Sequence, residues 1–285
     1  ANQGADAFVR HFVGAGGGLA TTELISVRAD GTGTGNGVVN DAEISADGRF
    51  VLLESMASDL VAGADTNSAA DIFLRDLQTQ TTVRVSSRLS PNGAGNAGSR
   101  DATMSADGSV VAFRSDATDL TPAATGNVTD LYLWSRSDGS LRRFVVPGAP
   151  LAANRLPVRA MNPVLSPDGR YLAFRTAAGV ADSGANGVWW HDLLAGTNAQ
   201  ANAGLSVSTA SGLDDSRGPV MSADGRTIAF EALVNTSEPK VHLWQADSGL
   251  HTMESLMQTV PPTGGEPATS EAPVLSADGS QIAFL

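Results

Sequence analysis

One five-residue phrase occurs five times in the chain, and it constrains the fold more than any other feature. Each copy has an apolar residue, then Ser, then Ala or Pro, then Asp-Gly, and the copies are residues 44–48, 104–108, 165–169, 221–225 and 275–279. Repeats at such spacing are typical of propellers and other repeat folds. The aspartates are 60, 61, 56 and 54 residues apart, longer than a WD repeat of about 40 to 45 residues, so we expect the excess in loops.

A short β-rich run follows each copy. The runs are residues 50–53, 110–113, 171–174, 227–230 and 281–284. The Asp-Gly pair between apolar runs predicts a tight hairpin turn, because Gly accepts positive φ and Asp bonds its own backbone. We therefore assign all five aspartates to turns and not to an acidic ring.

A second hairpin recurs after the first. Residues 71–76 lead to 82–85, residues 130–134 lead to 141–144, and weaker forms occur at 188–192 and 241–244. Two hairpins per repeat predict four strands. Alternation along such short runs is typical of antiparallel sheets.

The two ends of the chain carry complementary halves of one repeat. Residues 6–10 match residues 71–75, residues 22–27 supply a fourth strand, and the chain ends on a second strand at 281–285. We expect these half-blades to pair and close the ring, since closure removes exposed sheet edges. The prediction is an all-β, five-bladed β-propeller of four-stranded antiparallel blades, one domain over residues 1–285. The expected blades are 271–285 with 1–28, then 41–88, 101–146, 162–207 and 217–256.

The combination of Ser-x-Asp-Gly before an aromatic-containing strand, then Asp-x-Phe-x-Arg-Asp and a Thr-rich strand, resembles the TolB-like, WD-like propeller repeats of bacterial exported proteins. The resemblance covers nearly the whole chain. It implies the propeller fold, and for function it implies a binding module, a periplasmic scaffold or the gating domain of a serine peptidase. TolB-like domains have six blades, so five is a departure.

Composition removes several classes of function. The net charge is −12 and Lys240 is the only lysine, so no basic stripe exists for nucleic acid. The absence of cysteine excludes disulfides and thiolate sites. No apolar run reaches the roughly 18 to 20 residues of a membrane span, and the first residues show no signal segment. The acidic, Ala-, Gly-, Thr- and Ser-rich sequence indicates a periplasmic or extracellular protein.

Asp65, Asn67 and Asp71 place oxygen ligands at alternate positions, as calcium loops do. They are our candidate metal site, with calcium as the only cofactor considered. The alternative is a turn at Asp65 and Asn67, with Asp71 capping a strand. The next repeat has Ala124, Gly126 and Asp130 at these positions, so the ligand set does not recur.

Other chemistry-bearing residues favour structural roles. The histidines His11, His191, His242 and His251 occur without metal-ligand spacing. The tryptophans Trp134, Trp189, Trp190 and Trp244 fall at corresponding strand positions, which packing explains better than sugar stacking. No Gly-x-Ser-x-Gly elbow is present, and the glycine-rich run 31–37 does not fit a phosphate-binding motif. We predict no catalytic residues.

The long connections fall on one face of the predicted propeller, at residues 55–70, 87–100, 115–129, 147–162 and 255–272. Our leading hypothesis is a non-catalytic binding or scaffolding propeller that contacts a protein, a cell-envelope component or a second copy of itself through this long-loop face. The alternative is a five-bladed glycan hydrolase or lyase with carboxylates at the channel mouth, from Asp41, Glu43, Asp101 and Asp214 or Asp215. A third hypothesis is the regulatory propeller domain of a larger protein.

Overall fold

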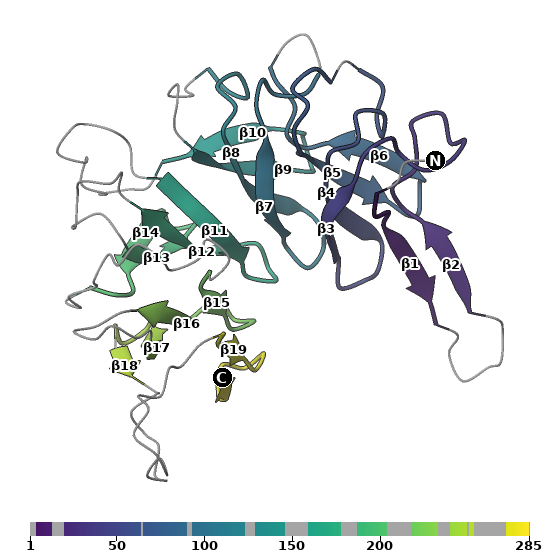
Figure 1. The fold of residues 1–285 in the computed structure, drawn as a ribbon. Helices are drawn as coiled ribbons and strands as arrows, with labels where there is room; N and C mark the ends of the chain where they lie inside the picture. Colours follow the sequence, from purple (N-terminus) through teal and green to yellow (C-terminus); the bar gives the residue numbers. More distant parts are fainter. Residues whose placement is uncertain are drawn as a thin grey trace, which may run out of the picture. The chain divides into compact units, whose positions relative to one another are not determined.

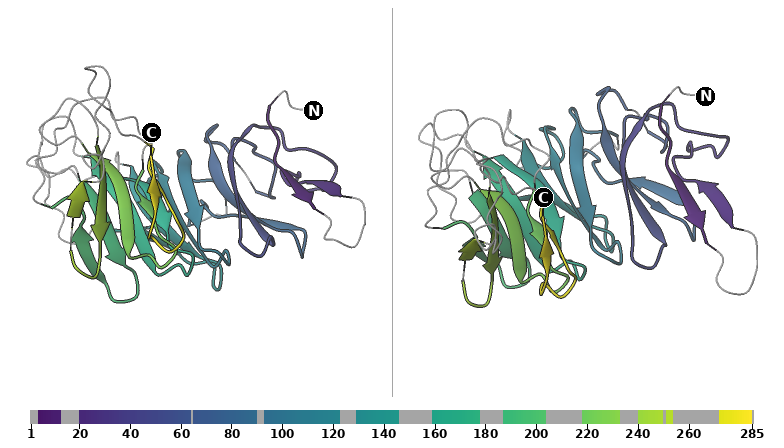
Figure 2. Two further views of the ribbon diagram at one scale, coloured as in Figure 1. Left: turned by 90° about the horizontal axis from the view of Figure 1, so that it is seen from below. Right: turned by 60° about the horizontal axis from the view of Figure 1, so that its bottom comes forward.

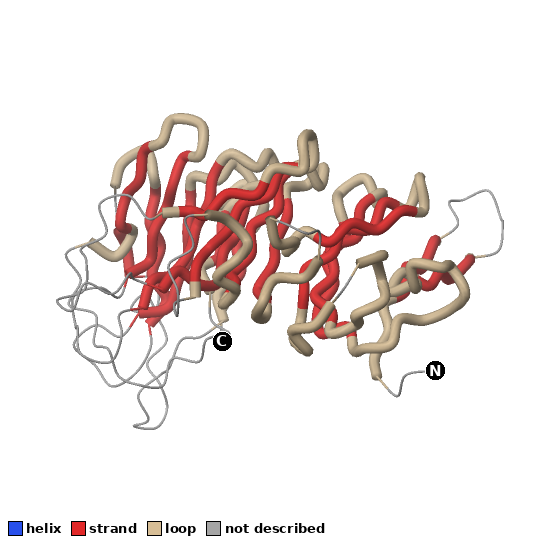
Figure 3. The backbone as a smooth tube through the Cα atoms, turned by 90° about the horizontal axis from the view of Figure 1, so that it is seen from above, coloured by secondary structure: helices blue, strands red, loops and turns tan. Residues whose placement is uncertain are grey.

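The computed structural model is all-β. It describes residues 4–12, 20–63, 65–89, 93–122, 129–145, 159–177, 187–203, 218–232, 240–249, 251–253 and 272–284. These residues form strands and connecting loops without any helix (Figure 3). Consequently this part of the chain offers no helix that could span a membrane.

Four antiparallel sheets have four strands each (Figure 1). The first contains β3 (Val39–Ile44), β4 (Phe50–Ser55), β5 (Asp71–Asp76) and β6 (Thr81–Arg84), and the second contains β7 (Ser99–Met104), β8 (Val110–Ser115), β9 (Asp130–Ser135) and β10 (Leu141–Phe144). The third contains β11 (Arg159–Leu165), β12 (Tyr171–Ala177), β13 (Gly187–Asp192) and β14 (Thr197–Gln200). The fourth contains β15 (Val220–Met221), β16 (Thr227–Ala232), β17 (Lys240–Gln245) and β18 (His251–Met253), which lie side by side in Figure 2. The predicted four-stranded antiparallel repeat is confirmed.

Each Ser-x-Asp-Gly phrase forms the predicted turn. In the first copy, the Ser45 hydroxyl donates to Asp47 at 2.6 Å and accepts from the Phe50 amide at 2.8 Å, and Gly48 has a φ of 71°. The serine-to-aspartate bond recurs in the other four copies, at 2.5 to 2.8 Å. All five aspartates therefore hold turns.

The same turns also join neighbouring sheets. The Ala46 amide donates to the Ala106 carbonyl at 2.8 Å, and the Ala223 amide donates to the Ala277 carbonyl at 2.7 Å. Gly108 approaches the ring of Phe50 so closely that an added Cβ would lie 3.0 Å from it. The glycine is thus required both for its positive φ and for the approach of the next sheet.

The core lies between successive sheets, on the second and third strands of each. In β4 and β5 almost every side chain is buried, because these strands have neighbours on both sides and sheets against both faces. One buried cluster joins Leu52, Leu74, Val111 and Tyr132, and another joins Ala173, Val188 and Phe230. The chain divides into two compact units, Ala1–Arg143 and Phe144–Leu285.

The two ends form separate two-stranded sheets. β1 (Phe8–His11) pairs with β2 (Thr21–Leu24), and β19 (Val274–Leu275) pairs with β20 (Ile282–Ala283). Among the described residues no ladder joins β20 to β1, so the expected closure and the count of five blades stay predictions.

Candidate functional site

Three of the predicted channel-mouth acids lie together with a fourth carboxylate. β3 carries Asp41 and Glu43, β4 carries Glu54, and β7 carries Asp101. Glu54 Oε2 accepts the Asp101 amide at 3.0 Å, and Glu43 Oε2 accepts the Met104 amide at 3.2 Å. The acids of the first sheet therefore bind the backbone of the second. Asp214 and Asp215 lie outside the described residues.

We call Asp41, Glu43, Glu54 and Asp101 the inner cluster. A backbone irregularity positions Asp101 in it. The β7–β8 ladder shifts register between Arg100 and Thr103, and Asp101 has a φ of 53°. Bulges of this kind re-aim side chains and leave a backbone amide free for another partner. The side chain of Asp101 pairs with Arg114 at 2.6 Å, while its amide goes to Glu54.

The same tie occurs in the second unit, where Glu231 accepts the Ala272 amide at 2.6 Å and Ala272 also has positive φ. Glu54 and Glu231 occupy the same position of their repeats, seven residues after the turn aspartates Asp47 and Asp224. Sequence reasoning missed both residues, although this repeated position was the available signal.

The space inside the inner cluster is very small. Asp41, Glu43, Leu52, Glu54 and Ala102 surround a cavity of about 10 Å³, close to the least volume that holds one water. Burial raises the pKa of Glu43, and the amide bond from Met104 opposes this shift. Asp41 is exposed beside this cavity, whereas Glu43 is partly buried.

The candidate calcium residues surround an arginine. Arg84 Nη2 lies 3.5 Å from Asp65, and Arg84 Nε lies 3.6 Å from Asp71. Asp71 also accepts the Ser86 hydroxyl at 2.7 Å, and burial raises the pKa of Asp71 to about 7. Asn67 instead binds loop backbone, donating to the Gly95 carbonyl at 2.9 Å and accepting the Ala69 amide.

Asp65 and Asp71 therefore lie beside the same arginine, whereas Asn67 binds loop backbone. Within the described part of the chain no three His, Asp or Glu side chains are placed to hold a metal ion. Calcium at Asp65, Asn67 and Asp71 stays a prediction, and the geometry puts a guanidinium beside the carboxylates that would bind it.

His191, His242 and Trp190 pack within and between sheets, whereas His11 is exposed. His242 is fully buried and stacks on Phe230, and His191 meets the edge of Phe144. Trp190 stacks on Tyr171, and its indole donates to the Gly225 carbonyl at 2.7 Å. His11 is exposed and lies 3.2 Å from Glu23. The side chain of His251 lies outside the described residues.

Two open grooves flank β6 in the first unit, and neither could be predicted from the sequence. Groove I has about 580 Å³, and its wall is made by Glu23, Leu24, Val27, Arg28, Ala29, Gly31, Leu60, Val61, Ala62, Arg75, Gln80, Thr81 and Thr82. Groove II has about 660 Å³, and its wall is made by Val61, Ala62, Thr82, Val83, Arg84, Val85, Ser87, Arg88, Leu89, Gly93, Leu120, Trp134, Gly139, Ser140 and Leu141. Both volumes are in the range of ligand sites.

The grooves occupy the same position in successive repeats. Aligning residues 21–29 with residues 81–89 matches Glu23 of groove I with Val83 of groove II. The motif that starts at Asp71 and Asp130 matches Arg75 with Trp134. Groove I is consequently charged where groove II is apolar.

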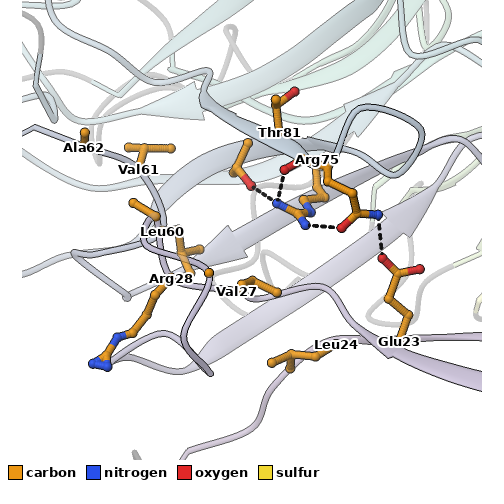
Figure 4. Close-up of a pocket in the computed structure, with 13 residues that line it drawn as sticks. Glu23, Leu24, Val27, Arg28, Leu60, Val61, Ala62, Arg75 and Thr81 are labelled. Carbon is orange, nitrogen blue, oxygen red and sulfur yellow. Dashed lines mark hydrogen bonds between the residues drawn. The ribbon is translucent and has the colours of Figure 1, made fainter.

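Groove I contains a chain of hydrogen bonds from β5 to β2 (Figure 4). Arg75 donates to Gln80 Oε1 at 2.6 Å and to the Gln80 carbonyl at 2.9 Å. Gln80 Nε2 then donates to Glu23 Oε1 at 2.8 Å. This bond lowers the pKa of Glu23, and burial lowers the pKa of Arg75.

No protein-family model matches the sequence, and no curated protein is significantly similar to it. Solved structures do match. A prolyl endopeptidase aligns at 14% identity and a TM-score of 0.56, over 99% of this chain and 36% of that one. The β-propeller domain of the Trilobed protease from Pyrococcus furiosus, described as having an open velcro topology, aligns at 9% identity and a TM-score of 0.53, over 93% and 66%.

TolB from Acinetobacter baumannii aligns at 17% identity and a TM-score of 0.48, over 92% of this chain and 53% of that one. The chain thus spans about half of this TolB and about a third of the endopeptidase. The likeness to the Trilobed protease domain shows the fold of this chain, a β-propeller.

Proposed function

We propose that the chain is a non-catalytic binding or scaffolding propeller of the bacterial envelope or exterior, which holds a protein partner at its loops and outer rim. The observation that carries this proposal is that three carboxylates of the inner cluster already have partners within the protein. Glu43 and Glu54 accept backbone amides, Asp101 pairs with Arg114, and the cavity between them has about 10 Å³. Glycoside hydrolysis needs two carboxyl groups on opposite sides of a bound sugar, whereas Glu43, Glu54 and Asp101 already have partners within the protein.

Groove II supplies the contact surface. Val83 is 45% exposed and Leu89 is 57% exposed, and Trp134 and Leu141 line the same groove. Part of its wall comes from the long connections 55–70 and 87–100, as expected for the long-loop face. An open groove with an apolar lining and a polar rim is typical of a protein contact.

The partner is testable by photo-crosslinking with a benzophenone amino acid in place of Leu89, in an envelope extract of the source bacterium. We expect one adduct at position 89, its loss on Val83→Asp, and its retention on Asp41→Ala. The same probe at Leu194, which is exposed on a turn outside groove II, is the control. Equal adducts at both positions, or an adduct that survives Val83→Asp, would contradict the proposal.

The enzyme alternative has its own test. Turnover of arabinan, pectin or a peptide that disappears on Glu43→Gln or Asp101→Ala, with folding retained, would replace the binding function. We expect no turnover in the unsubstituted chain.

We also propose that residues 1–285 form one closed ring of five blades, with β19–β20 and β1–β2 completing the fifth. Phe8 is 59% exposed, whereas Phe73 at the same repeat position has no exposed surface. In the first sheet Leu53 is the cross-strand partner of Phe73, and the repeat gives Phe284 as the equivalent partner of Phe8. Among the described residues no strand lies beside Phe8 as β4 lies beside Phe73.

The chain has no cysteine, so a Phe8→Cys, Phe284→Cys variant can form only one intramolecular disulfide. We expect oxidation to produce it in monomers, giving faster migration on a non-reducing gel and a higher melting temperature. The matched control is Phe12→Cys, Phe284→Cys. Disulfides only between molecules, or equal yields in both variants, would rule out the closed ring.

A further inference from the structure

Arg75 differs from the other buried arginines of the first unit. Arg84 lies beside Asp65 and Asp71, Arg114 pairs with Asp101, and Arg143 pairs with Asp130. Arg75 is 7% exposed and forms no ion pair with any described residue. A buried guanidinium is costly without a counter-charge, so this wall of groove I presents a positive charge that the protein itself does not neutralise by contact.

The Arg75 guanidinium donates hydrogen bonds to neutral oxygen atoms and not to a carboxylate. Arg75 donates to the carbonyl and side-chain oxygens of Gln80 and to Thr82 Oγ1, and its Nε atom has no hydrogen-bond partner. Gln80 has an exposed side chain and a φ of 58°, a left-handed conformation that costs free energy in a residue other than glycine. Its Nε2 atom also donates to the Leu77 carbonyl at 2.8 Å, so an anion at Arg75 would have to displace the exposed Gln80 side chain from these contacts.

The other end of the Gln80 amide marks a second charge. Gln80 Nε2 donates to Glu23 Oε1, while Glu23 Oε2 lies 3.2 Å from His11. The amide therefore gives an acceptor to a cation and a donor to an anion, across adjacent atoms. A group with a carboxylate and an ammonium on one carbon has the same polarity, and it adds a full charge at each end.

The remaining wall is open and holds four large apolar side chains beside Arg28, Thr81 and Thr82. Leu24 and Val27 lie on one side of the groove and Leu60 and Val61 on another (Figure 4). The volume of about 580 Å³ leaves room beyond the charged pair for a large side chain. Apolar walls with a few convergent polar groups are typical of small-molecule sites.

We propose that groove I binds a free α-amino acid with a large apolar side chain, whose carboxylate replaces the Gln80 oxygen at Arg75 and whose ammonium replaces the Gln80 nitrogen at Glu23. The side chain packs on Leu24, Val27, Leu60 and Val61. This site is separate from the protein contact of groove II and does not depend on it. Groove II lacks this pair of opposite charges, because Val83 and Trp134 stand at the positions of Glu23 and Arg75.

Calorimetric titration of the full chain at neutral pH with leucine, N-acetylleucine and leucinamide tests the proposal. The second compound lacks the ammonium and the third lacks the carboxylate. We expect leucine to bind, and each derivative to bind at least about tenfold more weakly, because a charge-assisted hydrogen bond is lost. Gln80→Gly should tighten leucine binding, since it removes the competing amide and suits the positive φ.

Glu23→Gln should remove the preference for leucine over N-acetylleucine while leaving the melting curve in place, because Glu23 is partly exposed. Val83→Gln, at the equivalent position of groove II, is the matched control and should change nothing. The proposal is overturned if leucine does not bind, if all three compounds bind equally, or if Glu23→Gln leaves the preference intact.

Discussion

Groove I and groove II lie on the two sides of the same strand, β6, and have similar volumes, about 580 and 660 Å³. Their walls come from equivalent positions of successive repeats. In groove I those positions hold Glu23 and Arg75, and in groove II they hold Val83 and Trp134. The repeat fixes where a groove occurs, while single residues within the repeat fix what the groove can bind.

The two grooves also differ in how they treat buried charge. In the wall of groove II, the Arg84 guanidinium lies 3.5 Å from Asp65 and 3.6 Å from Asp71. In groove I, Arg75 meets only neutral oxygens. Removing a guanidinium that is paired with buried carboxylates leaves those charges uncompensated, whereas a guanidinium held by neutral groups remains able to take an anionic ligand.

The largest expected difference is in stability. Arg84→Met leaves Asp65 and Asp71 buried without their cation, and we expect it to lower the free energy of unfolding by about 3 to 5 kcal/mol. Arg75→Met deprives no carboxylate of a partner, and we expect a cost below about 1 kcal/mol. Urea denaturation of both variants measures the contrast. Equal losses of unfolding free energy in the two variants would show that Arg75 contributes as much to stability as Arg84.

A smaller difference should appear in the pH dependence of stability. Burial raises the pKa of Asp71 from 3.8 to about 7, so between these values the folded state binds more protons than the unfolded state. The contribution of Asp71 to the free energy of unfolding is therefore greatest below about pH 4 and is lost as the pH rises through about 7. In groove I the bond from Gln80 lowers the pKa of Glu23 below its ordinary value of 4.5, so the contribution of Glu23 to the free energy of unfolding is lost on acidification.

Urea denaturation between pH 3 and pH 8 separates the two groups. Asp71→Asn should flatten the slope on the neutral side, and Glu23→Gln should change the acidic side alone. An Asp71→Asn variant with an unchanged slope above pH 5 would mean that Arg84 keeps Asp71 ionised throughout.

The smallest expected effect is that of calcium. To bind Asp65 and Asp71, the ion would have to displace the Arg84 guanidinium, so we expect the same melting temperature in chelator and in millimolar calcium. Any ligand of the folded state stabilises it by mass action. A clear rise in melting temperature with calcium, absent in Asp65→Asn, would establish the calcium site and remove Arg84 from its role as counter-ion.

Much of the fold could be predicted because its determinants are local. The turn at Ser45, Asp47 and Gly48 needs only residues within five positions of each other, and β4 follows where the apolar run predicted it. The candidate site was harder. Position before a first strand predicts that Asp41, Glu43 and Asp101 are acids of a channel mouth. The structure places Asp41 and Glu43 at one small cavity with Glu54, which accepts the Asp101 amide. The bonds of Glu43 and Glu54 to the second sheet depend on the Met104 and Asp101 amides, more than 45 residues along the chain, and no sequence pattern marks those amides.

The sequence by itself determined the repeat, the strands, the turns and the absence of cysteine and basic chemistry, because each depends on neighbouring residues or on composition. Only the tertiary structure decided which side chains share a groove. Glu23 and Gln80 are 57 residues apart and belong to different hairpins. Packing places Gln80, and not an acid, within hydrogen-bond distance of Arg75. Burial and hydrogen-bond partners are properties of the folded chain, so the sequence could not show that the buried Arg75 guanidinium contacts only neutral groups.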